Sequence, residues 1–487
     1  MHVRHCGATA TDLVDKHNAF RFGRAGVWFI SHLLMAMILC ASGATLAAED
    51  DDELPDEDSS QTPFHMQPDD EFVIPEGDIR PGAGRHVLLN DGSGKPVVGR
   101  IHVEGDNRYL VLMPDGVIQS VSKEEAVITN RPFEVRSRDE IQESLVNGPF
   151  EGFEVKRTKN FLYLYTCSKP FSKATSTILE TMYPKLRNFC ENLDLDIHDP
   201  EFPLVVIMFG DRESFDEYKQ MPRGVAAYYS MISNHIVMYE DPELTEISPQ
   251  LALKQSVSTI AHEGVHQILY NIGVQQRFSR WPMWIGEGLP EYCSPTETGQ
   301  RAKWRGLGLV NNLRMHSLLQ YRDYKKGKPD WFALKGVVEA KGLTALGYAH
   351  AWGIVYGMAK SRKTKDKFAA LLRDLSDMGP LEKSPEPGYY FRKHFGDDYR
   401  ENRKHVVKEL GKVKKKYVDP IENQTYFVAV IETRSAYHTQ ISTSLSALKE
   451  WASTASAHGV DGTFRIEAFP SRTKARAAKA KFLRSRR

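Results

Sequence analysis

The spacing of hydrophobic residues changes several times along the chain, and each change marks a predicted element. Two unbroken apolar runs, 161–165 and 204–209, have the length and the β-branched and aromatic content of buried strands, and the segment 173–193 between them has helical periodicity. A further strand pair is expected within 225–239, after which the pattern is mainly helical. Residues 150–419 therefore predict one domain of the α+β class, a mixed sheet followed by a helical subdomain.

Two smaller units flank this domain. From 85 to 135, short apolar runs alternate with Asp/Asn-Gly turns, which predicts a small SH3-like β-barrel module of a kind that binds or packs and rarely catalyses. Residues 424–487 predict a small αβ domain, whose strand-helix-strand-helix order resembles peptidoglycan-binding repeat domains of the cell-division type. Its expected elements are the strand 426–431, the helix 437–456, the strand 463–468 and the basic helix 472–483.

The first 48 residues have the layout of an export signal. Arg21 and Arg24 precede an apolar run, 25–48, that ends in small residues. This order is typical of a secretory signal peptide, and the run is also nearly long enough to stay as a membrane anchor. Either interpretation predicts a secreted, periplasmic or outer-face protein, with membrane contact only through this segment if it is uncleaved. The acidic stretch 49–84 then predicts a disordered linker.

Composition excludes some classes of function. Lys and Arg total 64 against 63 Asp and Glu, a formal net charge of +1, which argues against a nucleic-acid partner for the whole chain. The five cysteines are too few for a disulfide scaffold. Without the leader, Cys167, Cys190 and Cys293 remain, and we expect either a Cys167–Cys190 bridge or three buried thiols.

The candidate chemistry begins with a His-Glu-x-x-His motif at 262–266. On a helix, His262 and His266 lie one turn apart on the same face, so both imidazoles can reach one metal ion. Glu263 lies beside them, where its carboxylate can take a proton from a metal-bound water. Apolar residues at helical spacing flank the motif, and Gly273 supplies a stop. The alternative is an ordinary helix with two hydrogen-bonded histidines.

A second acidic segment, WPMWIGEGLPEY, follows at 281–292. Zinc hydrolysis needs three protein ligands and one open position, and Glu287, 21 residues beyond His266, can return to the metal from the first turn of a second helix. Glu291, one turn further on, is either that ligand or an acceptor for the N–H of a ligating histidine. Two solvated carboxylates would fit poorly among these aromatic residues and glycines.

HEGVH followed by WIGEGLPEY resembles the gluzincin clan of zinc metallopeptidases, above all bacterial peptidase-MA-like domains of largely unknown function. The resemblance covers about 150–418. It implies Zn²⁺ held by His262, His266 and Glu287, with Glu263 as the general base.

The resemblance extends further along the chain. Clan members carry a tyrosine roughly sixty residues past the third ligand, and Tyr348 lies 61 residues past Glu287. The resemblance implies that the Tyr348 phenol stabilises the oxyanion of the tetrahedral intermediate, or that His350, which stands where the clan has a lysine, does so instead. A core aromatic residue is an equal interpretation of Tyr348. The segment 224–237 resembles the clan's edge strand, which pairs with a peptide backbone.

These features together predict a secreted or periplasmic zinc metallopeptidase with a peptide or protein substrate. The Gly-x-Met-Glu-Asn segment of aminopeptidases is missing, which favours an endopeptidase or a very restricted substrate. Two alternatives stay open: a non-catalytic zinc-binding scaffold on a cell-wall polymer, and a zinc amidase acting on peptidoglycan.

Overall fold

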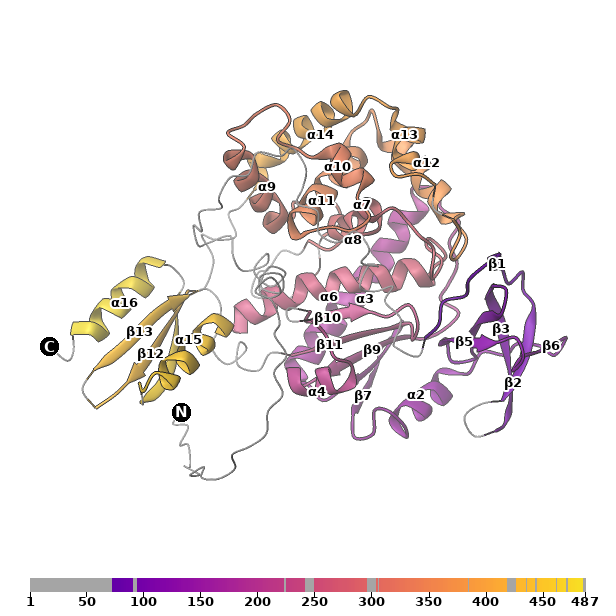
Figure 1. Cartoon of the computed structure of the whole chain (residues 1–487), viewed down its shortest axis with the longest axis horizontal. Coiled ribbons are helices and arrows are strands. Elements are labelled where there is room, and N and C mark those ends of the chain that lie inside the picture. The colour runs from indigo at the N-terminus through magenta and orange to yellow at the C-terminus, as the bar shows by residue number, and fades with distance from the viewer. Residues whose placement is uncertain are drawn as a thin grey trace, which may run out of the picture.

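The computed structural model describes residues 72–484 except 91–93, 223–224, 241–248, 296–303, 305, 384, 418–425, 435, 443–444, 461 and 470–471. The predicted leader and the part of the predicted linker before residue 72 lie outside the described residues. Several sheets and many helices make the chain α+β, as expected (Figure 1). None of the described helices has the length and apolar content needed to span a lipid bilayer.

The central sheet has the strand order β10-β11-β9-β8-β7. β8, β9 and β11 run parallel, whereas β7 and β10 are antiparallel edge strands. The two apolar runs became β8 and β9 with the predicted bounds, and the predicted strand pair became β10 and β11. The bounds are β7 (Glu154–Arg157), β8 (Phe161–Tyr165), β9 (Leu204–Phe209), β10 (Ala227–Tyr229) and β11 (His235–Tyr239).

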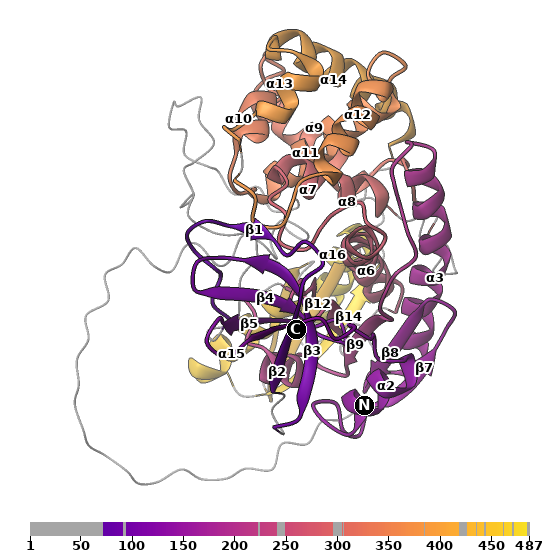
Figure 2. The same cartoon turned by 90° about the vertical axis from the view of Figure 1, so that its right-hand side faces the viewer.

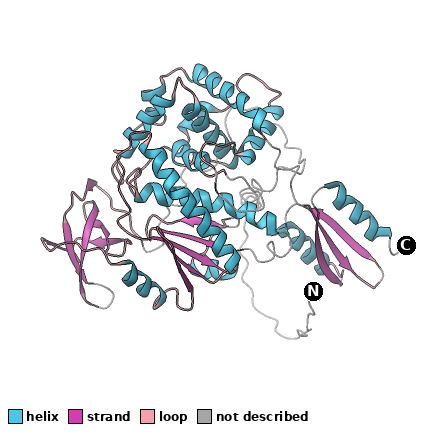
Figure 3. Ribbon diagram, turned by 180° about the vertical axis from the view of Figure 1, so that it is seen from behind, coloured by secondary structure: helices cyan, strands magenta, loops and turns pink. Residues whose placement is uncertain are grey.

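Helices cover both faces of this sheet because its three parallel strands, β8, β9 and β11, are buried on both sides. One face packs against α3 (Lys169–Glu191) and α6 (Pro249–Asn271), and the other against α2 (Arg138–Val146) and α4 (Arg212–Tyr218). The opposite side of α6 faces a helical subdomain, so that α6 lies between sheet and helices (Figures 1 and 3).

The helical subdomain is built around α11 (Ala345–Lys360), which contacts α7, α8, α9, α10, α12 and α14. Its small residues allow this crowding, and nearly the whole helix is buried. The other bounds are α7 (Met283–Gly286), α8 (Gly288–Cys293), α9 (Asn312–Tyr324), α10 (Leu334–Glu339), α12 (Lys365–Ser376), α13 (Tyr389–Phe395), α14 (Tyr399–Val413) and the 3₁₀ turn η2 (Lys414–Lys416).

The predicted β module is an antiparallel sheet in the order β5-β4-β3-β2-β6, with β1 paired to β3 (Figure 2). It begins earlier than predicted: β1 lies within the range predicted as disordered linker, and Phe72 stacks on Phe278 with 5.7 Å between ring centroids. The apolar side chains within that acidic stretch pack against the hydrophobic core, which orders this part of the chain. The bounds are β1 (Arg80–Pro81), β2 (His86–Asn90), β3 (Pro96–Glu104), β4 (Arg108–Leu112), β5 (Ile118–Ser122) and β6 (Val127–Thr129).

This N-terminal sheet shares its core with the central domain. Leu110 and Ile118 are fully buried in the same hydrophobic cluster as α3 and α6. The Ile118 amide donates to the Ile232 carbonyl at 2.8 Å, and the Arg277 guanidinium donates to the Gly116 carbonyl at 2.8 Å and to that of Met231 at 3.1 Å. Residues 230–234, the turn between β10 and β11, are therefore held by the N-terminal sheet.

The C-terminal unit differs from the predicted order. Residues 437–442 form a strand and not the start of a helix, so the unit reads strand, strand, helix, strand, helix. The alternation in YHTQIS suits an edge strand, and β12 takes a partner on each side in the order β13-β12-β14. The bounds are β12 (Tyr426–Glu432), β13 (Tyr437–Ser442), α15 (Leu445–Ala457), β14 (Thr463–Phe469) and α16 (Arg472–Arg484).

Cys167, Cys190 and Cys293 are all free and buried, so the bridge between Cys167 and Cys190 is not formed and the alternative of three buried thiols holds. Burial raises the pKa of both Cys167 and Cys190 to about 12, which makes them unreactive as thiolates at neutral pH.

Candidate metal centre

The helix α6, which lies between the sheet and the helical subdomain, carries the His-Glu-x-x-His motif. It ends near Gly273, which has a left-handed φ of 88°, as the sequence predicted. Gly264 lies where α6 crosses α3, and a Cβ there would come within 2.4 Å of the side chains of Leu179 and Met182. The glycine inside the motif therefore lets the two helices approach closely.

The three predicted ligands converge. His262 Nε2 lies 3.3 Å from His266 Nε2 and 3.2 Å from Glu287 Oε2, and His266 Nε2 lies 3.6 Å from the same carboxylate oxygen. Glu287 lies between α7 and α8, directly before the first residue of α8, whereas the sequence predicted it in the first turn of a second helix. His266 and Glu287 are buried, and the His262 side chain is 14% exposed, so His262 is the member of the cluster that solvent reaches.

These distances suit one metal ion. Ligand atoms about 2.0–2.1 Å from a tetrahedral Zn²⁺ are separated from one another by about 3.3 Å. The three pairs of atoms all fall close to that value, and two imidazoles plus one carboxylate are a donor set of catalytic zinc sites. The residues thus form a possible metal-binding triad.

The electrostatics of His262 also favour a cation at this place. Burial works to lower the pKa of His262, but the hydrogen bond with Glu287 and the charges of Glu291 and Glu263 outweigh burial and raise it to about 9. The proton on His262 thus supplies the positive charge between these carboxylates, and a bound metal ion would take the place of that proton.

Glu291 occupies the position predicted for a second carboxylate behind the ligands. Its Oε1 lies 3.5 Å from His262 Nδ1, on the far side of the ring from Glu287. Its oxygens accept from the Arg314 guanidinium at 2.6 Å and from the Asn311 amide at 2.8 Å. Burial works to raise the pKa of Glu291, but Arg314 outweighs it and lowers that pKa, so Glu291 stays charged behind His262.

Arg314 and Asn311 were not predicted as site residues. Both belong to the start of α9, where Asn311 caps the helix by accepting from the Arg314 amide at 3.1 Å. Asparagine is a common N-cap of helices in general, so the sequence alone gives no sign that Asn311 and Arg314 are buried against Glu291. Only the packing of α9 on α11 brings them there.

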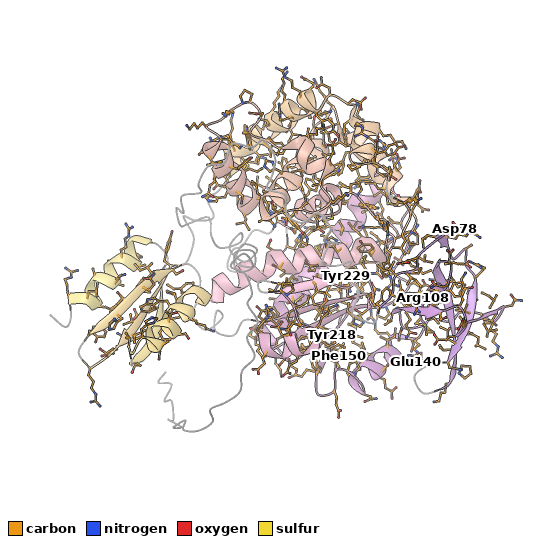
Figure 4. All side chains as sticks on the ribbon, in the orientation of Figure 1. Asp78, Arg108, Glu140, Phe150, Tyr218 and Tyr229 are labelled. Atoms are coloured by element: carbon orange, nitrogen blue, oxygen red, sulfur yellow. The ribbon has the colours of Figure 1, made fainter. Side chains whose placement is uncertain are left out.

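Glu263 points to the edge strand of the sheet. Its Oε2 accepts a hydrogen bond from the backbone N–H of Tyr229, the last residue of β10, at 2.9 Å. Tyr229, labelled in Figure 4, lies beside α6. Burial raises the pKa of Glu263, which makes its carboxylate a stronger base than an exposed one. The edge strand expected from the sequence is therefore next to the triad.

Tyr348 faces the triad from α11. Its ring centroid lies 6.4 Å from that of His262, and the Arg314 guanidinium lies over the Tyr348 ring, 5.3 Å from the ring centroid. Burial, with the charge of Glu287, raises the pKa of Tyr348 well above its usual value. The phenol therefore keeps its proton at neutral pH and is able to donate it in a hydrogen bond.

His350 is turned the other way. Two residues after Tyr348, it lies on the opposite side of α11, because successive helical residues are about 100° apart. Its ring is fully buried and both ring nitrogens have no hydrogen-bond partner among the described residues. The aromatic side chains around it are Tyr321, Trp331 and Phe332. The structure thus brings Tyr348, and not His350, to the triad.

Residues 256–382, which hold the triad, Glu291, Arg314 and Tyr348, match the model of a family described as "Protein of unknown function (DUF1570)". No curated protein matches the chain. The stretch similar to this family begins just before the motif on α6 and ends after α12, so it contains every residue of the candidate metal centre except those of the edge strand β10.

Proposed function

We propose that the protein is a zinc-dependent metallopeptidase of the gluzincin type that hydrolyses peptide bonds outside the cytoplasm. The observation that carries this proposal is the convergence of His262, His266 and Glu287 beside a carboxylate, Glu263, that is held in place by a backbone amide. Three donors with an accessible side are the arrangement of catalytic rather than structural zinc sites. Export rests on the leader, whose basic-apolar-small order is typical of a signal peptide.

Each residue has a role in this proposal. His262, His266 and Glu287 would hold the ion, which when bound supplies Lewis acidity that polarises a carbonyl and makes water more acidic. Glu263 takes the proton of the attacking water and passes it to the leaving amine. Tyr348 donates a hydrogen bond to the oxygen on which negative charge develops.

A peptide substrate is favoured by the edge strand. In the described sheet, β10 pairs with β11 on one side only, and it ends at the residue that contacts Glu263. An extended peptide that adds to this edge would pass directly by the general base. A cell-wall amide remains the second candidate substrate, because the predicted leader would bring the protein to the cell envelope.

The test uses the mature chain purified without its leader. Metal content is measured by atomic emission, and cleavage is followed by mass spectrometry on a peptide library and on peptidoglycan. We expect one zinc per chain and peptide cleavage, both lost in His262→Ala. The matched variant Glu263→Gln should keep zinc and lose cleavage.

Other outcomes separate the alternatives. Stoichiometric zinc with no cleavage of either substrate would support the binding scaffold. Release of stem peptides from peptidoglycan, with the library untouched, would support the amidase. A chain that binds no zinc, or a Glu263→Gln variant with full activity, would overturn the proposal.

A further inference from the structure

We propose that Asn234 is a positioning residue: it holds the edge strand β10 against α6 and so keeps the Tyr229 amide in its hydrogen bond with Glu263. Its effect on hydrolysis rests on the proposed function, but the positioning itself does not. The inference starts from the turn between β10 and β11, which ends at a residue in an unusual conformation.

Asn234 has a left-handed φ of 63°, a conformation in which asparagine is one of the few tolerated side chains. Its amide donates to the Ser230 carbonyl at 2.8 Å, and the Ser230 amide donates to the His235 carbonyl at 2.9 Å, which closes the turn. The Asn234 side chain is buried, at 4% exposure, and is aimed at α6 rather than at solvent.

The contacts with α6 form a reciprocal pair of amides. Asn234 Nδ2 donates to Asn271 Oδ1 at 2.8 Å, and Asn271 Nδ2 donates to Asn234 Oδ1 at 2.7 Å. In addition, Gln267, the residue after His266, donates through Nε2 to the Asn234 carbonyl at 2.8 Å and to the Val205 carbonyl of β9 at 2.9 Å. The turn is thereby fixed to the same helix that holds the two histidines.

The link to Glu263 runs through Tyr229. Its hydroxyl donates to Asn234 Oδ1 at 2.8 Å, its ring stacks on Tyr270 of α6 with centroids 5.3 Å apart, and its amide donates to Glu263 Oε2. The side chain of Tyr229 is therefore fixed by Asn234 and Tyr270, and its main-chain amide in turn fixes Glu263. One carboxylate oxygen is fixed in this way, which leaves the other to exchange protons with the reacting water.

Without Asn234, the strand would have less to keep it in place. β10 has three residues and one strand neighbour in the described sheet, so few main-chain hydrogen bonds remain. Residues with few bonds open locally far more often than a core strand. A purely architectural asparagine would lower overall stability, whereas a positioning residue would selectively release the Tyr229 amide.

The experiment measures amide hydrogen exchange in the zinc-loaded full chain and compares the wild type with two variants. Mass-spectrometric fragmentation resolves the exchange to single residues. Asn234→Gly removes the side chain and accepts the left-handed φ. The control is Asp194→Gly, which replaces an exposed residue of similar φ, 54°, in the turn after α3. We expect the Tyr229 amide to exchange at least tenfold faster in Asn234→Gly only, with the amides of 260–268 unchanged. Equal Tyr229 exchange in the wild type and Asn234→Gly would overturn the proposal.

Two further measurements keep the outcomes distinct. If Asn234→Gly does not fold, Tyr229→Phe removes only the hydroxyl link, and we expect its residue 229 amide to exchange about threefold faster; no change would again overturn the proposal. On a cleaved peptide, kcat should fall about tenfold in Asn234→Gly with zinc affinity unchanged. If the wild type cleaves nothing, the proposed function fails, while the exchange comparison still decides the role of Asn234.

Discussion

Gly288 lies against the main-chain carbonyl of Ala351, so close that a Cβ at position 288 would stand 2.8 Å from that oxygen. The helices α8 and α11 therefore touch through their backbones. This contact sets how far Glu287, on one side of the interface, reaches toward the histidines, and where Tyr348, one turn before Ala351, faces them.

The replacement Gly288→Ala should force α8 away from α11. We expect a loss of about 1–3 kcal/mol in the free energy of unfolding, because the clash is with backbone rather than with a movable side chain. Zinc affinity should fall as well, measured by competition with a chromophoric chelator. The control Gly411→Ala, on α14 with no atom near its Cβ, should gain about 0.4–1 kcal/mol.

Removing Arg314 should weaken metal binding without touching a ligand. In Arg314→Met, the buried Glu291 loses its charge partner, so the carboxylate no longer orients His262 firmly. We expect zinc affinity to fall by about 10–100-fold, the usual effect of a residue behind the ligands. Arg322→Met, on the same helix but in an exposed ion pair, should bind zinc like the wild type. Wild-type affinity in Arg314→Met would contradict this role of the arginine.

Replacing each candidate oxyanion donor in turn should show whether Tyr348 or His350 has that role. Tyr348→Phe removes the hydroxyl of a ring that lies beside His262 and should lower kcat by about 10²-fold or more, with zinc content unchanged. His350→Phe replaces a buried ring that packs on other rings, so kcat should stay within about twofold. Steady-state kinetics on a cleaved peptide measure both. The reverse result would make His350 the donor.

Buried histidines should make the protein less stable in mild acid. Burial lowers the pKa of His235 to about 4 and that of His350 to about 3, from 6.5 in an unfolded chain. The unfolded state therefore binds more protons between pH 6.5 and the folded-state values, and stability is lost as the pH falls through that window.

His350→Phe isolates one of these contributions. Between pH 7 and pH 5, the wild type should lose about 2 kcal/mol more in the free energy of unfolding than this variant, because the unfolded His350 is protonated at pH 5 and the folded one is not. Urea unfolding at the two pH values gives both losses. Parallel losses in the two proteins would show that His350 is protonated or exposed in the folded state.

Much of the fold and of the triad could be predicted because the signals are local. Buried strands are solid apolar runs, so β8 and β9 were found to the residue, and a His-Glu-x-x-His spacing fixes a face of one helix whatever surrounds it. Glu287 could be predicted because the connection from α6 to α7, residues 272–282, is long enough for the chain to return to the motif and too short to hold another domain.

The remainder depends on contacts between distant segments. Nothing near Arg314 in the sequence shows that its charge is buried against Glu291, and the helix phase that turns Tyr348 toward the triad and His350 away depends on how α11 packs. The strand at 437–442 was missed for a related reason: a short alternating stretch becomes a strand only where a partner such as β12 is free.

The N-terminal sheet, finally, is not structurally independent of the rest of the chain. A chain shortened to begin at residue 150 would leave Ile232, Arg277 and Phe278 without the contacts they make with residues 72–118, and would uncover the apolar cluster beneath that sheet. Recombination that attached another module in front of the domain that holds the triad would meet the same obstacle. We therefore expect the two parts to be inherited, expressed and degraded as one unit, with proteolysis between them yielding no stable fragment.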